Sequence, residues 1–220
     1  MKTISKLVKG SETKNARNVA KASGISMMAL SLAACGGGGS APAPVVVVEA
    51  VPITSALTIW NDTVAGTTAD DVVTGARIDT VQVFNSGDSI VLGDGNDSLS
   101  ATLNAGTVTP VAMTGVENVM FTVLGDATVD FDNVSGVTSI ISRGSSATLL
   151  VDDIQEIPTS ISINNNTAVQ TFVVKDTAVS GNEDSITLNF DGVGGVVNVG
   201  GETDGDGDIE TFTIVASAGA

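Results

Sequence analysis

Short apolar runs, separated by Gly, Asn, Asp and Ser, follow one another along the chain after residue 100. The runs are rich in β-branched residues and none keeps a helical period, so each predicts a β-strand. The expected strands lie at residues 116–123, 127–131, 137–142, 147–151, 160–163, 169–175, 185–190, 196–199 and 210–215. The pattern predicts an all-β protein, and β-sandwich modules stay an alternative for its C-terminal half.

Between residues 61 and 100, a triplet of aspartate, any residue and an apolar residue returns every eight or nine positions. This period does not suit a helix. It suits a β-solenoid, in which each coil contributes a turn, a short strand and one inward side chain per rung. We therefore expect a parallel β-solenoid (β-roll or β-helix) with the apolar members stacked inward as one ladder. The triplets begin at Asp62, Asp71, Asp79, Asp88 and Asp97 and end at Val64, Val73, Val81, Ile90 and Leu99.

The last rung, residues 92–100, follows the pattern G-G-x-G-x-D-x-U-x with only the first glycine replaced. In this it resembles the repeats-in-toxin family of calcium-binding β-rolls, whose glycines permit positive φ and whose aspartates and turn carbonyls face a calcium ion. The other rungs keep the aspartate and the apolar residue but lose most of the glycines. The resemblance covers residues 61–100 and implies a β-roll fold with Ca²⁺ as its ligand.

The resemblance also implies which carboxylates share an ion. In a β-roll, successive turns alternate between two edges, so turns two repeats apart are neighbours. Asp79 and Asp97 are then expected to face one ion, and Asp71 and Asp88 to face the other edge. The implied ligand set, with the glycines that open the last turn, is Asp79, Gly93, Gly95, Asp97, Asp71 and Asp88.

A second acidic segment lies near the C-terminus. Asp204, Asp206 and Asp208 alternate with glycines, a spacing that can turn three carboxylates toward one ion. The glutamate of an EF-hand loop is absent at its position, and no helix is expected on either side. The segment is therefore a candidate cation site, with an exposed acidic turn as the alternative.

The N-terminus begins with a basic lead and continues with a short apolar run that ends at Cys35. The run is too short to span a bilayer and is typical of a secretory signal. Leu32-Ala33-Ala34-Cys35 resembles a bacterial lipobox, which implies that Cys35 is lipidated and that residues 1–34 are removed. Cleavage near Ala34 without lipidation is the alternative. Gly36 after the cysteine implies, by the same resemblance, the outer membrane.

Four segments follow from these patterns. Residues 1–34 are expected to be a lipoprotein signal peptide, and residues 35–52 have the Gly/Ala/Pro composition of a flexible linker. Residues 53–100 are expected to form the β-roll rungs. Residues 101–220 are expected to form an irregular β-solenoid, with room for further coils beyond residue 220.

Composition narrows the function. After residue 34 the chain has three basic and 24 acidic residues, a net charge of −21, which argues against nucleic acid and anionic lipid surfaces as partners. It has no histidine, no tyrosine and no cysteine other than Cys35, which excludes imidazole chemistry, zinc thiolate sites and disulfides. One tryptophan and six phenylalanines offer few platforms for stacking sugars. An enzyme is not expected.

Two segments, residues 114–119 and 134–140, resemble the degenerate solenoid segments of surface-layer proteins and large adhesins of Gram-negative bacteria. This implies an exported, lipid-anchored structural protein of the cell surface, stiffened by calcium. An adhesin or surface-binding module without lattice assembly is the alternative, and secretion is the alternative location. The expected partners are the membrane through the lipid anchor, other copies of the chain, or ligands on a cell surface.

Overall fold

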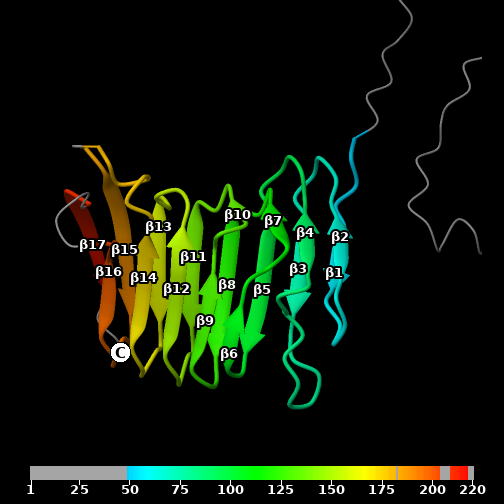
Figure 1. Cartoon of the computed structure of the whole chain (residues 1–220), viewed down its shortest axis with the longest axis horizontal. Helices are drawn as coiled ribbons and strands as arrows, with labels where there is room; N and C mark the ends of the chain where they lie inside the picture. Colours follow the sequence, from blue (N-terminus) through cyan, green and yellow to red (C-terminus); the bar gives the residue numbers. More distant parts are fainter. Residues whose placement is uncertain (1–48, 182, 204–208, 218–220) are drawn as a thin grey trace, which may run out of the picture. The chain divides into compact units, whose positions relative to one another are not determined.

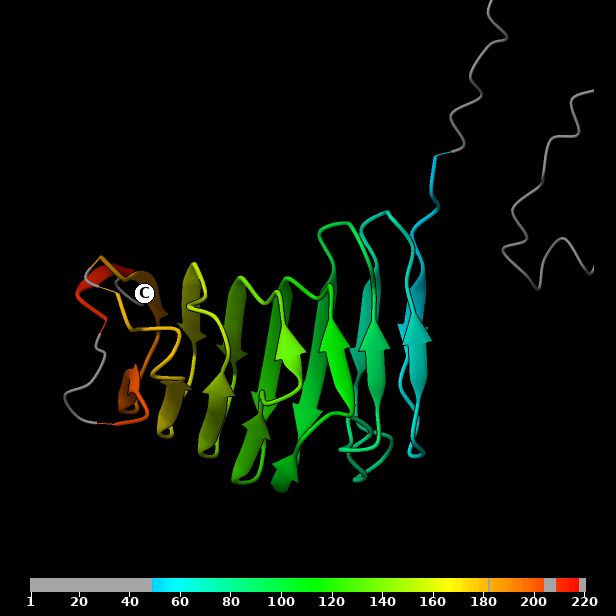
Figure 2. The same cartoon turned by 45° about the horizontal axis from the view of Figure 1, so that its top comes forward.

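The structure, a computed structural model, describes residues 49–181, 183–203 and 209–217. These residues form an all-β parallel solenoid, in which strands from successive coils lie side by side (Figure 1). Turning the view shows the loops that carry the chain from one sheet to the next (Figure 2). None of these residues is helical, so this part of the chain contains no helix that could cross a membrane.

The largest sheet has eight strands and runs the length of the solenoid. Every neighbouring pair in it is parallel. Its strands, in spatial order, are β1 (Thr54–Ala56), β3 (Val72–Gly75), β5 (Ser98–Leu103), β8 (Asn118–Val123), β11 (Ser139–Arg143), β13 (Ser160–Asn164), β15 (Ser185–Asp191) and β17 (Thr211–Ser217).

Two smaller sheets, also parallel, form the other faces of the coils. The four-stranded sheet contains β2 (Thr63–Ala65), β4 (Ser89–Val91), β7 (Ala112–Thr114) and β10 (Val134–Ser135). The five-stranded sheet contains β6 (Gly106–Val108), β9 (Ala127–Asp130), β12 (Leu149–Ile154), β14 (Gln170–Val174) and β16 (Val197–Gly201). Each of the strands predicted after residue 115 is present, and the parallel pairing confirms the solenoid and excludes the sandwich alternative.

Alternation of side chains explains why these residues form a solenoid. In β5 and β8 every second residue is buried and the residues between face outward, as a strand with one buried face requires. Register then stacks one apolar residue from each coil on the next, which removes apolar surface from water along the whole sheet. This inward ladder is Val73, Leu99, Val119, Ile140, Ile161 and Leu188.

The coils differ in length. Thr54 pairs with Val72, 18 residues later, but Val72 pairs with Ser98, 26 residues later. The second coil is longer because residues 76–88 form a loop, in which Ile78 and Val81 make an isolated antiparallel bridge. The loop contains the expected rung of Asp79, so this rung contributes no strand to any of the three sheets.

The expectation of a single five-membered ladder is therefore wrong. Val73 and Leu99 pair in the eight-stranded sheet, whereas Val64 and Ile90 pair in the four-stranded sheet. Val81 lies in the loop with 50% of its surface exposed. One triplet occupies half a coil, so consecutive triplets alternate between two sheets, and the loop takes the middle triplet out of the stack.

The core also contains a polar network, at the end of β11 and the turn that follows it. Ser142, Ser145, Asn166 and Gln170 are all buried. The Asn166 amide donates to Ser142 Oγ at 2.8 Å and accepts from the Ser145 N–H at 2.8 Å. The Ser142 hydroxyl donates to Gln170 Oε1 at 2.7 Å. The network ties three successive coils together through side chains.

Candidate metal centre

A column of carboxylates precedes the strands of the eight-stranded sheet, with Asp71 before β3, Asp97 before β5 and Glu117 before β8. Because these strands are parallel and paired in register, the three residues meet at one edge. Each carboxylate accepts a backbone N–H from the preceding coil. Ile53 N–H donates to Asp71 at 2.6 Å, Asp71 N–H donates to Asp97 at 2.7 Å, and Asp97 N–H donates to Glu117 at 2.7 Å.

Asp71 is buried but well supplied with donors. Its Oδ2 accepts the Thr67 N–H at 2.6 Å, and the Thr67 hydroxyl lies within 3.3 Å of both carboxylate oxygens. Burial alone would raise the pKa of Asp71, but the hydrogen bonds from Ile53 and Thr67 outweigh burial and hold the pKa below its usual value. Asp71 is therefore a stable anion in the folded protein.

Asp97 is buried in the same corner, but only half of its carboxylate has a partner. Oδ1 accepts the Asp71 N–H, whereas Oδ2 is the one buried side-chain oxygen or nitrogen in the described residues that has no hydrogen-bond partner. Burial raises the pKa of Asp97, and the nearby charges of Asp71, Glu117 and Asp70 raise it further. An unsatisfied buried acceptor costs about 1–3 kcal/mol. A bound cation would remove this cost.

The glycines of the last rung let its turn lie against the preceding coil. Gly93 and Gly95 have φ of +98° and +141°, values that residues with a Cβ rarely adopt. A Cβ at Gly93 would lie 2.6 Å from the Thr67 carbonyl oxygen, and a Cβ at Gly95 would lie 2.8 Å from the Ala69 carbonyl oxygen. Backbone carbonyls are thus close to the carboxylates, and both are the oxygen ligands that Ca²⁺ takes.

A second corner has the same construction before β2 and β4. Asp62 N–H donates to Asp88 Oδ1 at 2.9 Å, and Asn85 N–H donates to Asp88 Oδ2 at 2.8 Å. Burial raises the pKa of Asp88, and the charge of Asp62 adds to the rise. Both oxygens of Asp88 have partners, unlike those of Asp97. This corner is therefore the weaker candidate for an ion.

The structure corrects the pairing of the expected ligands. It brings Asp97 together with Asp71 rather than with Asp79, and Asp88 together with Asp62. Asp79 follows the end of β3 and Asp97 precedes the start of β5, so these two residues lie at opposite edges of a parallel sheet. The sequence period alone could not show this, because the loop at residues 76–88 lengthens the coil.

Glu117 and Asp70 are acidic residues of this corner that the triplet pattern did not include. Glu117 follows Asp97 by 20 residues, which is the length of one coil in this region. Asp70 accepts the Asn96 N–H at 2.9 Å. Spacing by one coil, rather than by one nonapeptide, was the signal that could have identified Glu117. The expected sites at Cys35 and at Asp204, Asp206 and Asp208 lie outside the described residues.

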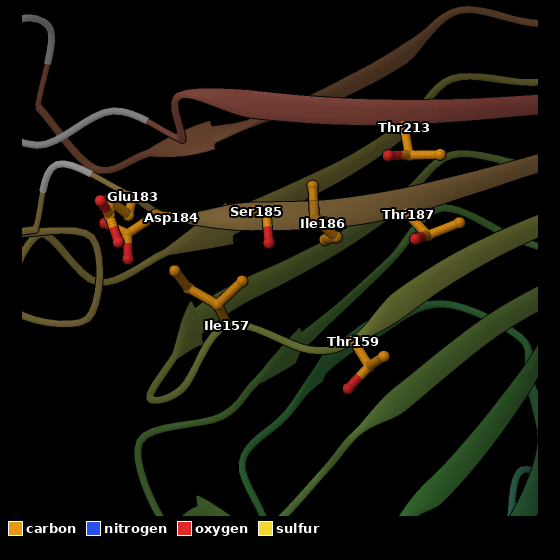
Figure 3. A pocket seen from close by; sticks show the side chains of 8 residues that line it. All are labelled: Ile157, Thr159, Glu183, Asp184, Ser185, Ile186, Thr187 and Thr213. Atoms are coloured by element: carbon orange, nitrogen blue, oxygen red, sulfur yellow. The ribbon is translucent and has the colours of Figure 1, made fainter.

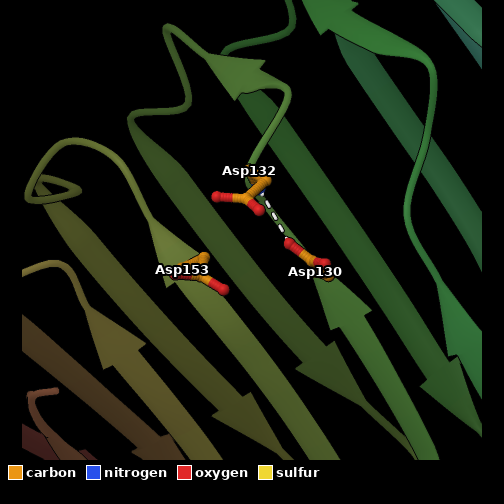
Figure 4. A group of neighbouring side chains, drawn as sticks. All are labelled: Asp130, Asp132 and Asp153. Carbon is orange, nitrogen blue, oxygen red and sulfur yellow. Dashed lines mark hydrogen bonds between the residues drawn. The ribbon is translucent and has the colours of Figure 1, made fainter.

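A third acidic group lies at the ends of β9 and β12. Oxygens of Asp130, Asp132 and Asp153 lie within 4.8 Å of one another, close enough to hold a metal ion (Figure 4). Lys175 already occupies this group, since its Nζ lies 2.6 Å from Asp132 and 3.5 Å from Asp153. The hydrogen bond to Asp132 raises the pKa of Lys175. The ammonium ion would compete with a metal ion here, so the corner of Asp97 is the better candidate.

Known proteins provide no further guide to this corner. A scan against protein-family models and a search of curated proteins both gave no match to this chain.

Proposed function

We propose that this chain is an exported, lipid-anchored structural protein of the bacterial cell surface, whose β-solenoid is stiffened by calcium at the corner of Asp71 and Asp97. The observation that supports it most is the buried Oδ2 of Asp97, which has no partner among several carboxylates. Calcium takes six to eight oxygen ligands and tolerates irregular geometry. Carboxylates and turn carbonyls from adjacent coils can supply them.

Calcium at this corner would act on stiffness because it joins adjacent coils. In a solenoid, each coil contacts only its neighbours, so stability depends on the interfaces between successive coils. Asp71 and Asp97 belong to adjacent coils and already share a hydrogen bond of 2.7 Å. An ion held by both would strengthen the interface that β3 and β5 form. This is a structural use of carboxylates, which fits a chain without imidazole or thiolate chemistry after its signal.

Asp97→Asn tests the calcium site. Asparagine keeps the oxygen that accepts the Asp71 N–H and removes the buried charge. In chelator we therefore expect the variant to melt at least as high as the parent protein. For a site with Kd of about 10⁻⁴–10⁻³ M, about 1 mM calcium should stabilise the parent by about 0.4–1.4 kcal/mol and leave the variant unchanged. Thermal melting followed by circular dichroism, with chelator and with calcium, measures both effects.

Asp88→Asn is the matched control, because its corner has the same construction but no unpartnered oxygen. It should keep the response to calcium. A parent protein whose melting temperature is the same with calcium and with chelator would contradict the proposal. The pH adds a check in chelator. The raised pKa of Asp97 means that protonation favours the folded state, so its contribution to stability rises as pH falls toward that pKa, whereas that of Asp71 falls at lower pH.

Cys35→Ser tests the anchor. The mature protein is expected to begin at Cys35, to partition into detergent and to incorporate labelled fatty acid. Each buried methylene of an acyl chain contributes about 0.8 kcal/mol, so several chains would hold the protein on the membrane. The serine variant should lose the label and leave the membrane fraction. Equal membrane retention of both forms would rule out this anchor.

The alternative function is a surface-binding module without lattice assembly. Both functions fit the same rigid solenoid, and they differ in whether copies associate with one another. Electron microscopy of the calcium-loaded protein separates them. Sheets or filaments support the surface-layer role, and dispersed single molecules support the binding module.

A further inference from the structure

The largest hollow in the described residues is a cavity of about 380 Å³ where β13 and β15 begin. Four hydroxyl side chains and two carboxylates line it, namely Thr159, Ser185, Thr187, Thr213, Glu183 and Asp184. The carboxylates lie at one end, and the three threonines lie toward the other (Figure 3). The size is at the small end of the usual range for ligand sites, about 300–1,000 Å³.

Two contacts hold the acidic end in place. The Gly181 N–H donates to Asp184 Oδ2 at 3.2 Å, and the Asp184 N–H donates to the Glu210 carboxylate at 2.8 Å. The second contact repeats the hydrogen bond from Asp97 N–H to Glu117 in the calcium corner. Asp184 keeps its second carboxylate oxygen available to a ligand.

The hydroxyl end continues into the outer face of the eight-stranded sheet. Ser, Thr and Asn occupy most outward positions of this sheet, and only Arg143 and Asp191 among them are charged. Strands lie about 4.8 Å apart, so the hydroxyl and amide groups form regular rows. One row crosses six neighbouring strands through Ser98, Asn118, Ser139, Ser160, Thr187 and Thr213.

The lining decides which ligand fits. No basic side chain lines the cavity, so an anionic ligand would meet Glu183 and Asp184 without compensation. No aromatic side chain lines it either, and Ile157 and Ile186 are its only apolar residues, which disfavours a flat aromatic ligand. A small cation would use the acidic end and leave the hydroxyl end idle. A neutral ligand with many hydroxyl groups can donate to the carboxylates and exchange hydrogen bonds with the threonines.

We propose that this cavity binds a neutral sugar unit, and that the polysaccharide carrying this unit lies along the hydroxyl rows of the eight-stranded sheet. A weakly charged face on a strongly acidic chain fits an uncharged polymer better than an anionic one. Without stacking rings each contact is weak, and repeated contacts along one polymer supply the affinity. The site is independent of calcium at Asp97, so it adds a binding activity to the structural role.

Affinity electrophoresis of the full-length protein in nonionic detergent tests the proposal. Native gels contain galactomannan or dextran as neutral polymers, polygalacturonate as an anionic polymer, or no polymer. We expect a neutral polymer to retard the protein. The double variant Thr187→Val, Thr213→Val removes two paired hydroxyls with little change in shape. It should weaken the retardation constant by about tenfold, as the loss of two ordinary hydrogen bonds would.

The matched control is Thr128→Val, Thr171→Val, which makes the same change on the five-stranded sheet, where both threonines pair with Leu150. It should migrate like the parent protein, and circular dichroism should show that both variants fold. Three results would overturn the proposal: no retardation by either neutral polymer, retardation by polygalacturonate alone, or the same loss in both double variants.

Discussion

Replacing Leu99 with aspartate is expected to lower the free energy of unfolding by about 4 kcal/mol or more. Leu99 is 1% exposed and lies in register between Val73 and Val119, which are both buried. An aspartate there would place a charge between two apolar coils with no donor facing it. Urea denaturation followed by circular dichroism measures the effect, and the variant should show little or no folded baseline.

Val81→Asp is the matched control, since Leu99 and Val81 both end an aspartate triplet. Val81 is 50% exposed in the loop of residues 76–88, so the aspartate stays in water. A change of about 0.5 kcal/mol or less is expected, as at other exposed surface positions. Equal urea midpoints for the two variants would show that the register of the eight-stranded sheet differs from the one described.

Asn166→Ala is expected to cost about 3–5 kcal/mol, a second large effect. Asn166 is fully buried, and its side chain accepts from the Ser145 N–H and donates to both Ser142 Oγ and the Ser142 carbonyl. Alanine leaves these groups without partners in a place that water does not reach. Urea denaturation again measures the loss.

Asn198→Ala provides the comparison for the polar network. Asn198 is exposed, and its side chain makes one hydrogen bond, of 3.2 Å, to the Thr171 hydroxyl. Its loss should change the free energy of unfolding by about 0.5 kcal/mol or less. If the two alanine variants unfold at the same urea concentration, the buried network does not stabilise the solenoid.

The fold class could be predicted from sequence because it depends on local patterns. Alternating apolar residues specify strands, and Gly, Asn and Asp between them specify turns, so the strands after residue 115 were found from the sequence alone. The glycines at positions 93 and 95 likewise marked a turn with positive φ, and the structure has it. Each of these inferences uses only neighbouring residues.

Contacts between coils could not be predicted in the same way. Which carboxylate meets Asp97 depends on how many residues each coil contains, and the loop at residues 76–88 changes that number. The same reason hid Glu117 and the group of Asp130, Asp132 and Asp153. Asp132 and Asp153 are separated by 21 residues, the coil length there, which is visible only once the strands are paired.

The loop at residues 76–88 also marks a place where the chain can accept foreign sequence. The ladder passes directly from Val73 to Leu99, so the residues between β3 and β4 do not set its register. The entropy of closing a loop grows only slowly with its length. A peptide epitope inserted near Asp79 would therefore be displayed on a solenoid that keeps its core, which makes this position a port for engineering.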